Sequence, residues 1–323
     1  LLTVMLAFVN GMYELTCTSG YPENVIVLSD GATDELFSNL NPSDVGDVGN
    51  QRGVARGVDD RPLASREIYL VVNQTIPDAP PGRPTRRFLQ IRGIEDSPIA
   101  SQVHRLSLFP GGEWFSAAGV EPASEATPNS RASIIQAVVG EGIAREMGRY
   151  RTEEQLATAR NRERLDVGDC FVLDDRPWKI VGVMQSAGST FDSEVWAKAS
   201  VVGPMFGKAA FTSVVVRAED ATAARSLRDY LTQKYGTAAL QAQVETDYFA
   251  TLGETSKQFF FGVVFVTIVM SVGGVFGVMN TMFAAISHRT KDIGVLRLLG
   301  FARWQIVAAF LLESLLIALV GGA

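Results

Sequence analysis

The sequence has few of the residues on which metal sites and disulfide frameworks depend. Two cysteines (Cys17, Cys170) and two histidines (His104, His288) occur in 323 residues. Two cysteines cannot form paired CxxC zinc sites or a disulfide framework, although a single Cys17–Cys170 disulfide stays open. Constellations in which histidine acts as base or activates a nucleophile also have little material. We therefore expect no catalytic site, no metal site and no bound cofactor in this chain.

Basic patches and phosphate-binding loops are missing as well. The formal net charge is −6, and no cluster of Lys and Arg interleaved with aromatics occurs, which argues against a nucleic-acid partner. GPMFGKA at 203–209 is one residue too short for a P-loop, and no Ser or Thr follows its lysine. GEGIAR at 140–145 fails the dinucleotide-binding pattern at the third glycine. No nucleotide site is therefore visible in the sequence.

Three isolated polar residues allow a site but favour a plainer interpretation. Asp192 and Glu194 are close enough in sequence to be imagined as a metal pair. A polar edge between a loop and a strand is the preferred interpretation of these two carboxylates. His104 stands alone near a strand, and we expect a surface or helix-cap residue there.

What the sequence has in excess is uncharged apolar length. Residues 259–286 carry no charge over 28 residues, and about 20 apolar residues span a bilayer. Residues 306–323 form a second apolar run, and residues 1–9 form a shorter one. We predict the end of a first transmembrane helix at 1–12, a stalk and second transmembrane helix at 246–287, and the start of a third at 304–323. The first and third are expected to be cut by the ends of the sequence.

The charges between the last two runs predict the orientation. That segment contains four basic residues (Arg289, Lys291, Arg297, Arg303) and one acidic residue, Asp292. Short loops rich in Lys and Arg stay in the cytoplasm. This predicts a cytoplasmic segment at 288–303 and an outside location for residues 13–245.

The outside segment reads as a mixture of strands and helices. Strand-like runs occur at 25–29, 66–74, 86–94 and 179–184, and a helix at 219–234 lies between two more strands. With a polar helix near 33–50, these predict a split βαβ layer carrying a β-rich insertion at about 75–205. The predicted fold class is an integral membrane α-helical bundle, present in part. A large α+β extracytoplasmic domain is inserted between its first and second transmembrane helices.

A short basic segment separates the two C-terminal apolar runs. Ile293, Leu296 and Leu299 fall on one face of a helix there, and Gly300 stands where a helix end favours a left-handed residue. A short helix at the membrane surface fits this pattern. Its apolar face could anchor it to lipid or be offered to a cytoplasmic partner.

Several motifs together carry a resemblance to a known family. NTM at 280–282, SHRTKDIGVLRLLGF at 287–301 and FLLES at 310–314 resemble the signature of FtsX-like ABC-transporter permeases. VVGEGIA at 138–144, LDVGD at 165–169 and IVGV at 180–183 resemble the MacB-like periplasmic core of that group. The sequence departs from the family pattern at His288 and Asp292, where glutamate is usual, and at Leu298, where alanine is usual.

The resemblance implies that 288–303 is a coupling helix that docks into an ATPase. The residues it assigns to ATPase coupling are Arg289, Lys291, Asp292, Ile293, Gly294, Leu296, Arg297, Leu299 and Gly300. The implied partners are an ABC ATP-binding subunit that holds ATP and Mg, a second permease copy as homodimer or heterodimer, a periplasmic adaptor and the lipid bilayer. The implied location is the bacterial inner membrane, crossed several times.

The implied function is that of a non-catalytic permease subunit. Such a subunit would couple ATP binding and hydrolysis in the partner to motion of the periplasmic domain. This motion would export or extract a substrate on the outer side of the inner membrane. The alternative is an FtsX-like transmembrane regulator that activates a periplasmic cell-wall enzyme.

Five residues are expected to pack inside the membrane. Gly273, Gly277 and Thr281 recur every four residues, which permits close approach of helices in lipid. Asn280 would form a hydrogen bond across that face. Glu313 lies about two turns into the third apolar run, where an ionised carboxylate is costly, so we expect it to be paired.

Overall fold

A computed structural model describes residue 11 and residues 19–76, 79–80, 82–122, 133–235 and 239–322. The side chains of 254–260, 281, 285, 314 and 317–322 are outside this description. The predicted helix at 1–12 (apart from residue 11) and Cys17 therefore also lie outside it, and Cys170 is an exposed free thiol. The described chain divides into two compact units, one within Leu6–Lys257 and the other within Gln258–Ala323.

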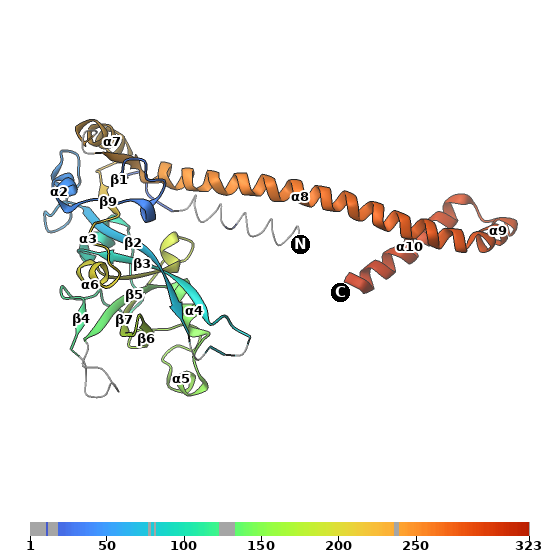
Figure 1. Cartoon of the computed structure of the whole chain (residues 1–323), viewed down its shortest axis with the longest axis horizontal. Coiled ribbons are helices and arrows are strands. Elements are labelled where there is room, and N and C mark those ends of the chain that lie inside the picture. Colours follow the sequence, from blue (N-terminus) through green and yellow to red (C-terminus); the bar gives the residue numbers. More distant parts are fainter. Residues whose placement is uncertain are drawn as a thin grey trace. The chain divides into compact units, whose positions relative to one another are not determined.

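A single mixed sheet organises the first unit (Figure 1). Its strands run in the order β10-β1-β9-β2-β3-β8-β5-β7-β6, with β4 beside β5. The strands are β1 (Asn24–Ser29), β2 (Ala64–Thr75), β3 (Arg86–Ile94), β4 (Val120–Glu121), β5 (Ile134–Gly140), β6 (Cys170–Leu173), β7 (Arg176–Met184), β8 (Glu194–Lys198), β9 (Ser213–Arg217) and β10 (Leu240–Val244). The helices of this unit are η1 (Glu35–Phe37), α2 (Pro42–Val45), η2 (Val48–Asn50), α3 (Ser97–Val103), α4 (Glu141–Gly148), α5 (Glu153–Thr158), η3 (Thr190–Ser193), α6 (Ala199–Met205) and α7 (Ala221–Tyr235).

The predicted strand–helix–strand near the end of this unit is confirmed as β9, α7 and β10. Both strands pair antiparallel with β1, which lies between them. They are therefore parallel to each other, and α7 makes a split βαβ crossover. Ala224, Leu227 and Leu231 are the buried residues of α7, at the spacing that the sequence predicts.

The middle of the chain extends the same sheet. Residues from the predicted insertion supply β3 to β8, and β3 pairs directly with β2 over nine residue pairs. The prediction of one polar helix near 33–50 is wrong, because this stretch forms the three short helices η1, α2 and η2. Pro42 begins α2 after the extended residue Asn41, because a residue before proline avoids the helical conformation, and Gly46 is the C-cap of α2.

Alternating side chains on the strands fill separate cores on the two faces of the sheet. Val25 and Val27 of β1 pack with α7, whereas Ile26 and Leu28 pack with Tyr248 at the start of the following helix. This division follows from the two-residue period of a strand. The first turns of that helix are thereby part of the domain core.

The helix that begins in this core continues into the second unit. It is α8 (Glu245–His288), of 44 residues, and it is followed by α9 (Thr290–Leu298) and α10 (Arg303–Gly322). Within α8, Phe261–His288 is long and apolar enough to cross a membrane, and none of its most apolar window is buried. The predicted left-handed residue after α9 is confirmed, since Gly300 has φ +92°.

Candidate functional site

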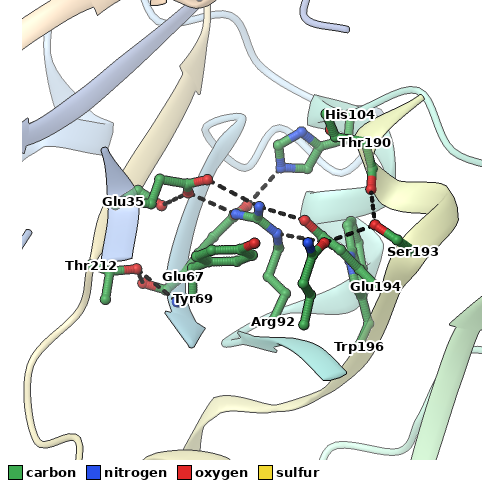
Figure 2. A network of polar contacts seen from close by, with 12 residues as sticks. Glu35, Glu67, Tyr69, Arg92, His104, Thr190, Ser193, Glu194, Trp196 and Thr212 are labelled. Atoms are coloured by element: carbon green, nitrogen blue, oxygen red, sulfur yellow. Dashed lines mark hydrogen bonds and ion pairs between the residues drawn. The ribbon is translucent and has the colours of Figure 1, made fainter. Parts of the chain in front are cut away.

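A cluster of buried charges lies on one face of the sheet in the first unit (Figure 2). Glu67 of β2, Arg92 of β3 and Glu194 of β8 come from three neighbouring strands. Their side chains share a face because Arg92 is paired in register with Tyr69, two residues from Glu67, and with Trp196, two residues from Glu194.

Arg92 is the centre of this cluster. Its guanidinium donates to Glu35 at 2.7 and 3.0 Å, to Glu67 at 2.6 Å and to Glu194 at 2.8 Å through both Nε and Nη2. The Arg92 side chain is only 4% exposed, so these contacts occur away from water. Such charge-assisted, partly bidentate bonds are what allows a buried guanidinium to remain charged. Three carboxylates sharing one guanidinium leave an excess of negative charge.

His104 continues the cluster toward α8. Its Nε2 lies 2.6 Å from Glu67 Oε1, and its Nδ1 lies 3.7 Å from Glu245 Oε1 without a hydrogen bond. Glu245 is the first residue of α8 and accepts from Asn24 Nδ2 at 2.9 Å. A chain of polar contacts therefore runs from Arg92 through Glu67 and His104 to the start of the long helix.

One expectation from the sequence holds here and one needs correction. His104 occupies the C-terminal cap of α3, the second of the two expected places, and it is 2% exposed. Glu194 is buried, because it pairs with Arg92 and accepts from Trp196 Nε1 at 2.7 Å, and it is not a polar edge. Among the described residues, no group of three or more His, Cys, Asp or Glu is arranged to hold a metal ion.

The mutual contacts move the pKa values of these groups in different directions. Burial opposes ionisation of Glu67, but the charges of His104 and Arg92 outweigh it and hold the pKa of Glu67 at about 2. Burial also opposes protonation of His104, yet Glu67 raises the pKa of that imidazole above its usual value. Burial raises the pKa of Glu245. His104 therefore lies between two buried carboxyls, and its raised pKa favours the cationic form.

We predict that the stability of the first unit falls as the pH rises above neutrality, and that His104→Gln flattens this fall. A raised native pKa gives stability that is present below about pH 6.5 and is lost as the pH rises through the native value. Glu245 acts with the same sign at lower pH. Melting temperatures between about pH 6 and about pH 9 measure the slope. His288→Gln is the control, and an equal slope in wild type and His104→Gln would contradict the assignment.

The residues predicted to couple to an ATPase lie on and around α9. Lys291, Asp292 and Arg297 are exposed and form no ion pair or hydrogen bond through their side chains with described residues. Ile293 and Leu296 are half-buried. The most exposed apolar side chain of the segment is Leu298, at 89%, and sequence reasoning did not include it. Its neighbour Leu299, which was included, is 71% exposed.

The structure joins two residues that the sequence analysis assigned to different roles. Arg289 Nη1 donates to both carboxylate oxygens of Glu313 at 3.1 Å. The expected pairing of Glu313 is therefore present, with Arg289 just before α9 as the partner. Arg289 directly follows the last residue of α8 and belongs to the predicted cytoplasmic segment. Its contact with Glu313 therefore places that residue of α10 near the end of α8.

The predicted packing face of α8 has open space beside two of its glycines. Gly273 and Gly277 have nothing within 4 Å of an added Cβ, and Asn280 is exposed. Thr281 belongs to α8, but its side chain is outside the description. A packing role for this face remains a prediction, and it requires another membrane helix to contact the face.

The chain is similar in sequence to permeases of ABC transporters. Residues 264–323, which include most of the second unit and all of α9, match the FtsX-like permease C-terminal family. Macrolide export ATP-binding/permease protein MacB of Burkholderia lata is 28% identical over 165 residues, which is 48% of this chain and 24% of that protein. MacB of Escherichia coli K12 is 27% identical over 166 residues, 49% of this chain and 26% of that protein.

Similarity extends to a Gram-positive relative and to two solved domains. The uncharacterized ABC transporter permease YknZ of Bacillus subtilis is 27% identical over 170 residues, 48% of this chain and 41% of that protein. The extracellular domain of YknZ aligns with 68% of this chain and 99% of its own (TM-score 0.44, 13% identity). The periplasmic region of MacB from Actinobacillus actinomycetemcomitans aligns with 77% and 97% (TM-score 0.44, 14% identity).

The chain is thus similar to ABC-transporter permeases, and its residues 264–323 match the FtsX-like permease C-terminal family. More particularly, it is similar to MacB and YknZ, and the aligned part spans less than half the length of each relative. The matched region overlaps the apolar segment Phe261–His288, which is long enough to cross a membrane.

Proposed function

We propose that this chain is the permease subunit of a mechanotransmission ABC transporter in the bacterial inner membrane. An ATP-binding partner that holds ATP and Mg docks on α9, and its motion is carried to a periplasmic domain that exports or extracts a substrate. The observation that carries the proposal is the exposed apolar and basic surface of α9 next to a helix that can cross a membrane. A surface of this kind is typical of a partner-binding helix.

Two features support transmission through the chain itself. α8 is continuous over 44 residues, or about 66 Å, from a residue in the buried charge cluster to the turn before α9. The Arg289–Glu313 pair ties that turn to α10, so a push on α9 is shared by both helices. Ion pairs gain strength where water is excluded, as at the edge of a bilayer. A second permease copy and a periplasmic adaptor complete the proposed assembly.

The proposed orientation can be tested by cysteine labelling. In a background with Cys17→Ser and Cys170→Ser, we expect Lys291→Cys to react only after the membrane is permeabilised and Arg160→Cys to react in intact cells. The reason is the basic loop around α9, which should stay inside. Exposure of both side chains in the structure makes them accessible to the reagent once it reaches their compartment. The reverse labelling pattern would contradict the proposal.

The proposed function itself is tested with a candidate ABC ATP-binding subunit from the same organism. We expect the full chain in lipid nanodiscs to retain that subunit and to change its rate of ATP hydrolysis. If this chain neither binds the ATP-binding subunit nor alters its rate of ATP hydrolysis under these conditions, the proposal is wrong.

A further inference from the structure

A cavity of about 520 Å³ opens beside the buried charge cluster in the first unit. The charged residues of its wall come from η1 and the residue before it, β3, α4 and the segment around η3, and α8 supplies three further lining residues. This volume lies in the range of small-molecule sites, which run from about 300 to about 1,000 Å³. The charge, the apolar surface and the unused polar groups of the wall indicate which molecule it accepts.

The charged wall of the cavity is acidic. Five carboxylates line it, and Arg92 is the only basic lining residue: Asp34, Glu35, Glu146, Asp192 and Glu194 against Arg92. The Arg92 guanidinium offers nothing to an anion, because it already donates to Glu35, Glu67 and Glu194. An anionic ligand would therefore be repelled by several carboxylates, and no lining residue offers it an unpaired positive charge.

Some of these carboxylates already accept hydrogen bonds from the protein, and one does not. Asp192 accepts from Gly142 N at 2.9 Å, and Asp34 accepts from Leu36 N at 2.8 Å. The carboxylate of Glu146 on α4 is exposed and makes no hydrogen bond or ion pair with a described residue, although its charge acts on the Arg87 guanidinium. Thr190 also lines the cavity, but its Oγ1 is enclosed within the wall and has no hydrogen-bond partner in the described chain. The cavity thus offers one carboxylate, Glu146, that no described residue binds.

The other wall is apolar and belongs to the long helix. Tyr248, Phe249 and Leu252 of α8 line the cavity, as do Leu36 and Ile143. The Tyr248 hydroxyl is held by the Glu35 N–H at 3.2 Å, which leaves the ring as part of the lining. Aromatic rings and aliphatic side chains next to carboxylates suit a molecule that has an apolar body and one positive charge.

We propose that this cavity binds a small amphiphilic cation, a protonated amine on an aromatic or aliphatic body. The amine lies against Glu146, and the body packs on Tyr248, Phe249 and Leu252. Because those three residues belong to α8, occupancy changes the contacts of the helix that continues to α9. The inference deepens the proposed function, on which this last step rests, by naming a ligand class that the transmission helix can sense.

Two fluorescent probes with the same aromatic body test the site. Dansylcadaverine carries a free primary amine, and its N-acetylated form is neutral. With the full chain in zwitterionic nanodiscs, and empty nanodiscs subtracted, we expect the amine to bind about twofold to fivefold more tightly than the neutral probe, as one partly exposed charge pair allows. Equal affinity of the two probes overturns the proposal.

Variants locate the probe in the cavity. Glu146→Gln should weaken dansylcadaverine about twofold to fivefold, and the matched control Glu154→Gln on exposed α5 should leave it unchanged. Leu252→Trp fills the apolar side and should remove binding of both probes. Equal loss in Glu146→Gln and Glu154→Gln, or unchanged binding in Leu252→Trp, overturns the assignment.

The transmission step and the binding site can fail separately. If the amine binds selectively but the ATP-binding subunit does not associate with the chain, the site stands and the proposed function is wrong. If the subunit associates normally and the two probes bind equally, the proposed function stands and the site is wrong. If both hold, saturating dansylcadaverine should change the ATPase rate in wild type and leave it unchanged in Leu252→Trp.

Discussion

Replacement of Arg92 by methionine should unfold or severely destabilise the sheet domain. Methionine fills much of the volume but leaves Glu35, Glu67 and Glu194 buried without their shared counter-charge. Removing one partner of a buried ion pair costs about 3–5 kcal/mol, and here three carboxylates lose the same partner. Since domains are stable by only about 5–15 kcal/mol, the loss is comparable to the whole margin. Thermal unfolding followed by tryptophan fluorescence measures it, because Trp178 and Trp196 are in the core.

A matched arginine separates this effect from the general loss of a positive charge. Arg66 lies on β2 and pairs with Glu95 at 3.0 Å, but the two side chains are 30% and 48% exposed. Arg66→Met should therefore cost no more than about 1 kcal/mol. Arg92→Lys should fall between the two, since an ammonium cannot reproduce the planar bidentate contacts. Equal melting temperatures for Arg92→Met and Arg66→Met would show that the cluster contributes little to stability.

Leu298→Asp should abolish retention of the ATP-binding subunit while the protein still inserts in the membrane. Leu298 is 89% exposed at the end of α9, and a partner that covers it would have to desolvate the new carboxylate. Loss of one well-buried interface residue costs about 2 kcal/mol or more, or about thirtyfold in affinity. Co-purification and the rate of ATP hydrolysis measure the effect. Leu296→Asp is a less direct test, because Leu296 is half-buried within the chain itself.

A control for this variant comes from the first unit. Val58 is 97% exposed, and Val58→Asp places the same charge on a surface that is not proposed to contact the ATPase. It should leave both co-purification and hydrolysis unchanged. Unaltered ATPase binding by Leu298→Asp, with normal membrane insertion, would remove α9 from the proposed interface.

The features that depend on neighbours in sequence could be predicted from the sequence. The apolar run at 259–286, the turn glycine Gly300 and the crossover of β9, α7 and β10 each express a local period or a local backbone requirement. The outcome at 33–50 shows the limit of this reasoning. A polar composition allowed one helix there, whereas Pro42 and Gly46 mark the two ends of a separate short helix.

The buried charge cluster could not be predicted, because its members are far apart in sequence. Arg92 meets Glu194 across 102 residues, and Asn24 meets Glu245 across 221. Each residue alone resembles an ordinary surface charge, as His104 and Glu194 did. The only available signal was polar residues inside strands whose neighbours are apolar, such as Arg92 in RRFLQIRGI. That pattern marks a buried charge in need of a partner but does not identify the partner.

The coupling segment shows a different limit. Its helix and glycine turn follow from the sequence, yet which apolar side chains remain exposed depends on how α9 packs. Ile293 and Leu296 are half-buried while Leu298 is exposed, so the surface offered to a partner is shifted along the helix. The pairing of Arg289 with Glu313 likewise depends on the return of α10 toward the end of α8.

The most direct measurement of the central claim is a cross-link from position 298 to the ATP-binding subunit. Leu298→Cys, in a chain that otherwise lacks cysteine, is treated with a short bis-maleimide in membranes that contain a partner with one cysteine in the candidate groove. We predict a permease–ATPase adduct, formed at a rate that changes when ATP is added, and no adduct from Val58→Cys. An unlinked position 298 in membranes where the two subunits still co-purify would contradict docking through α9.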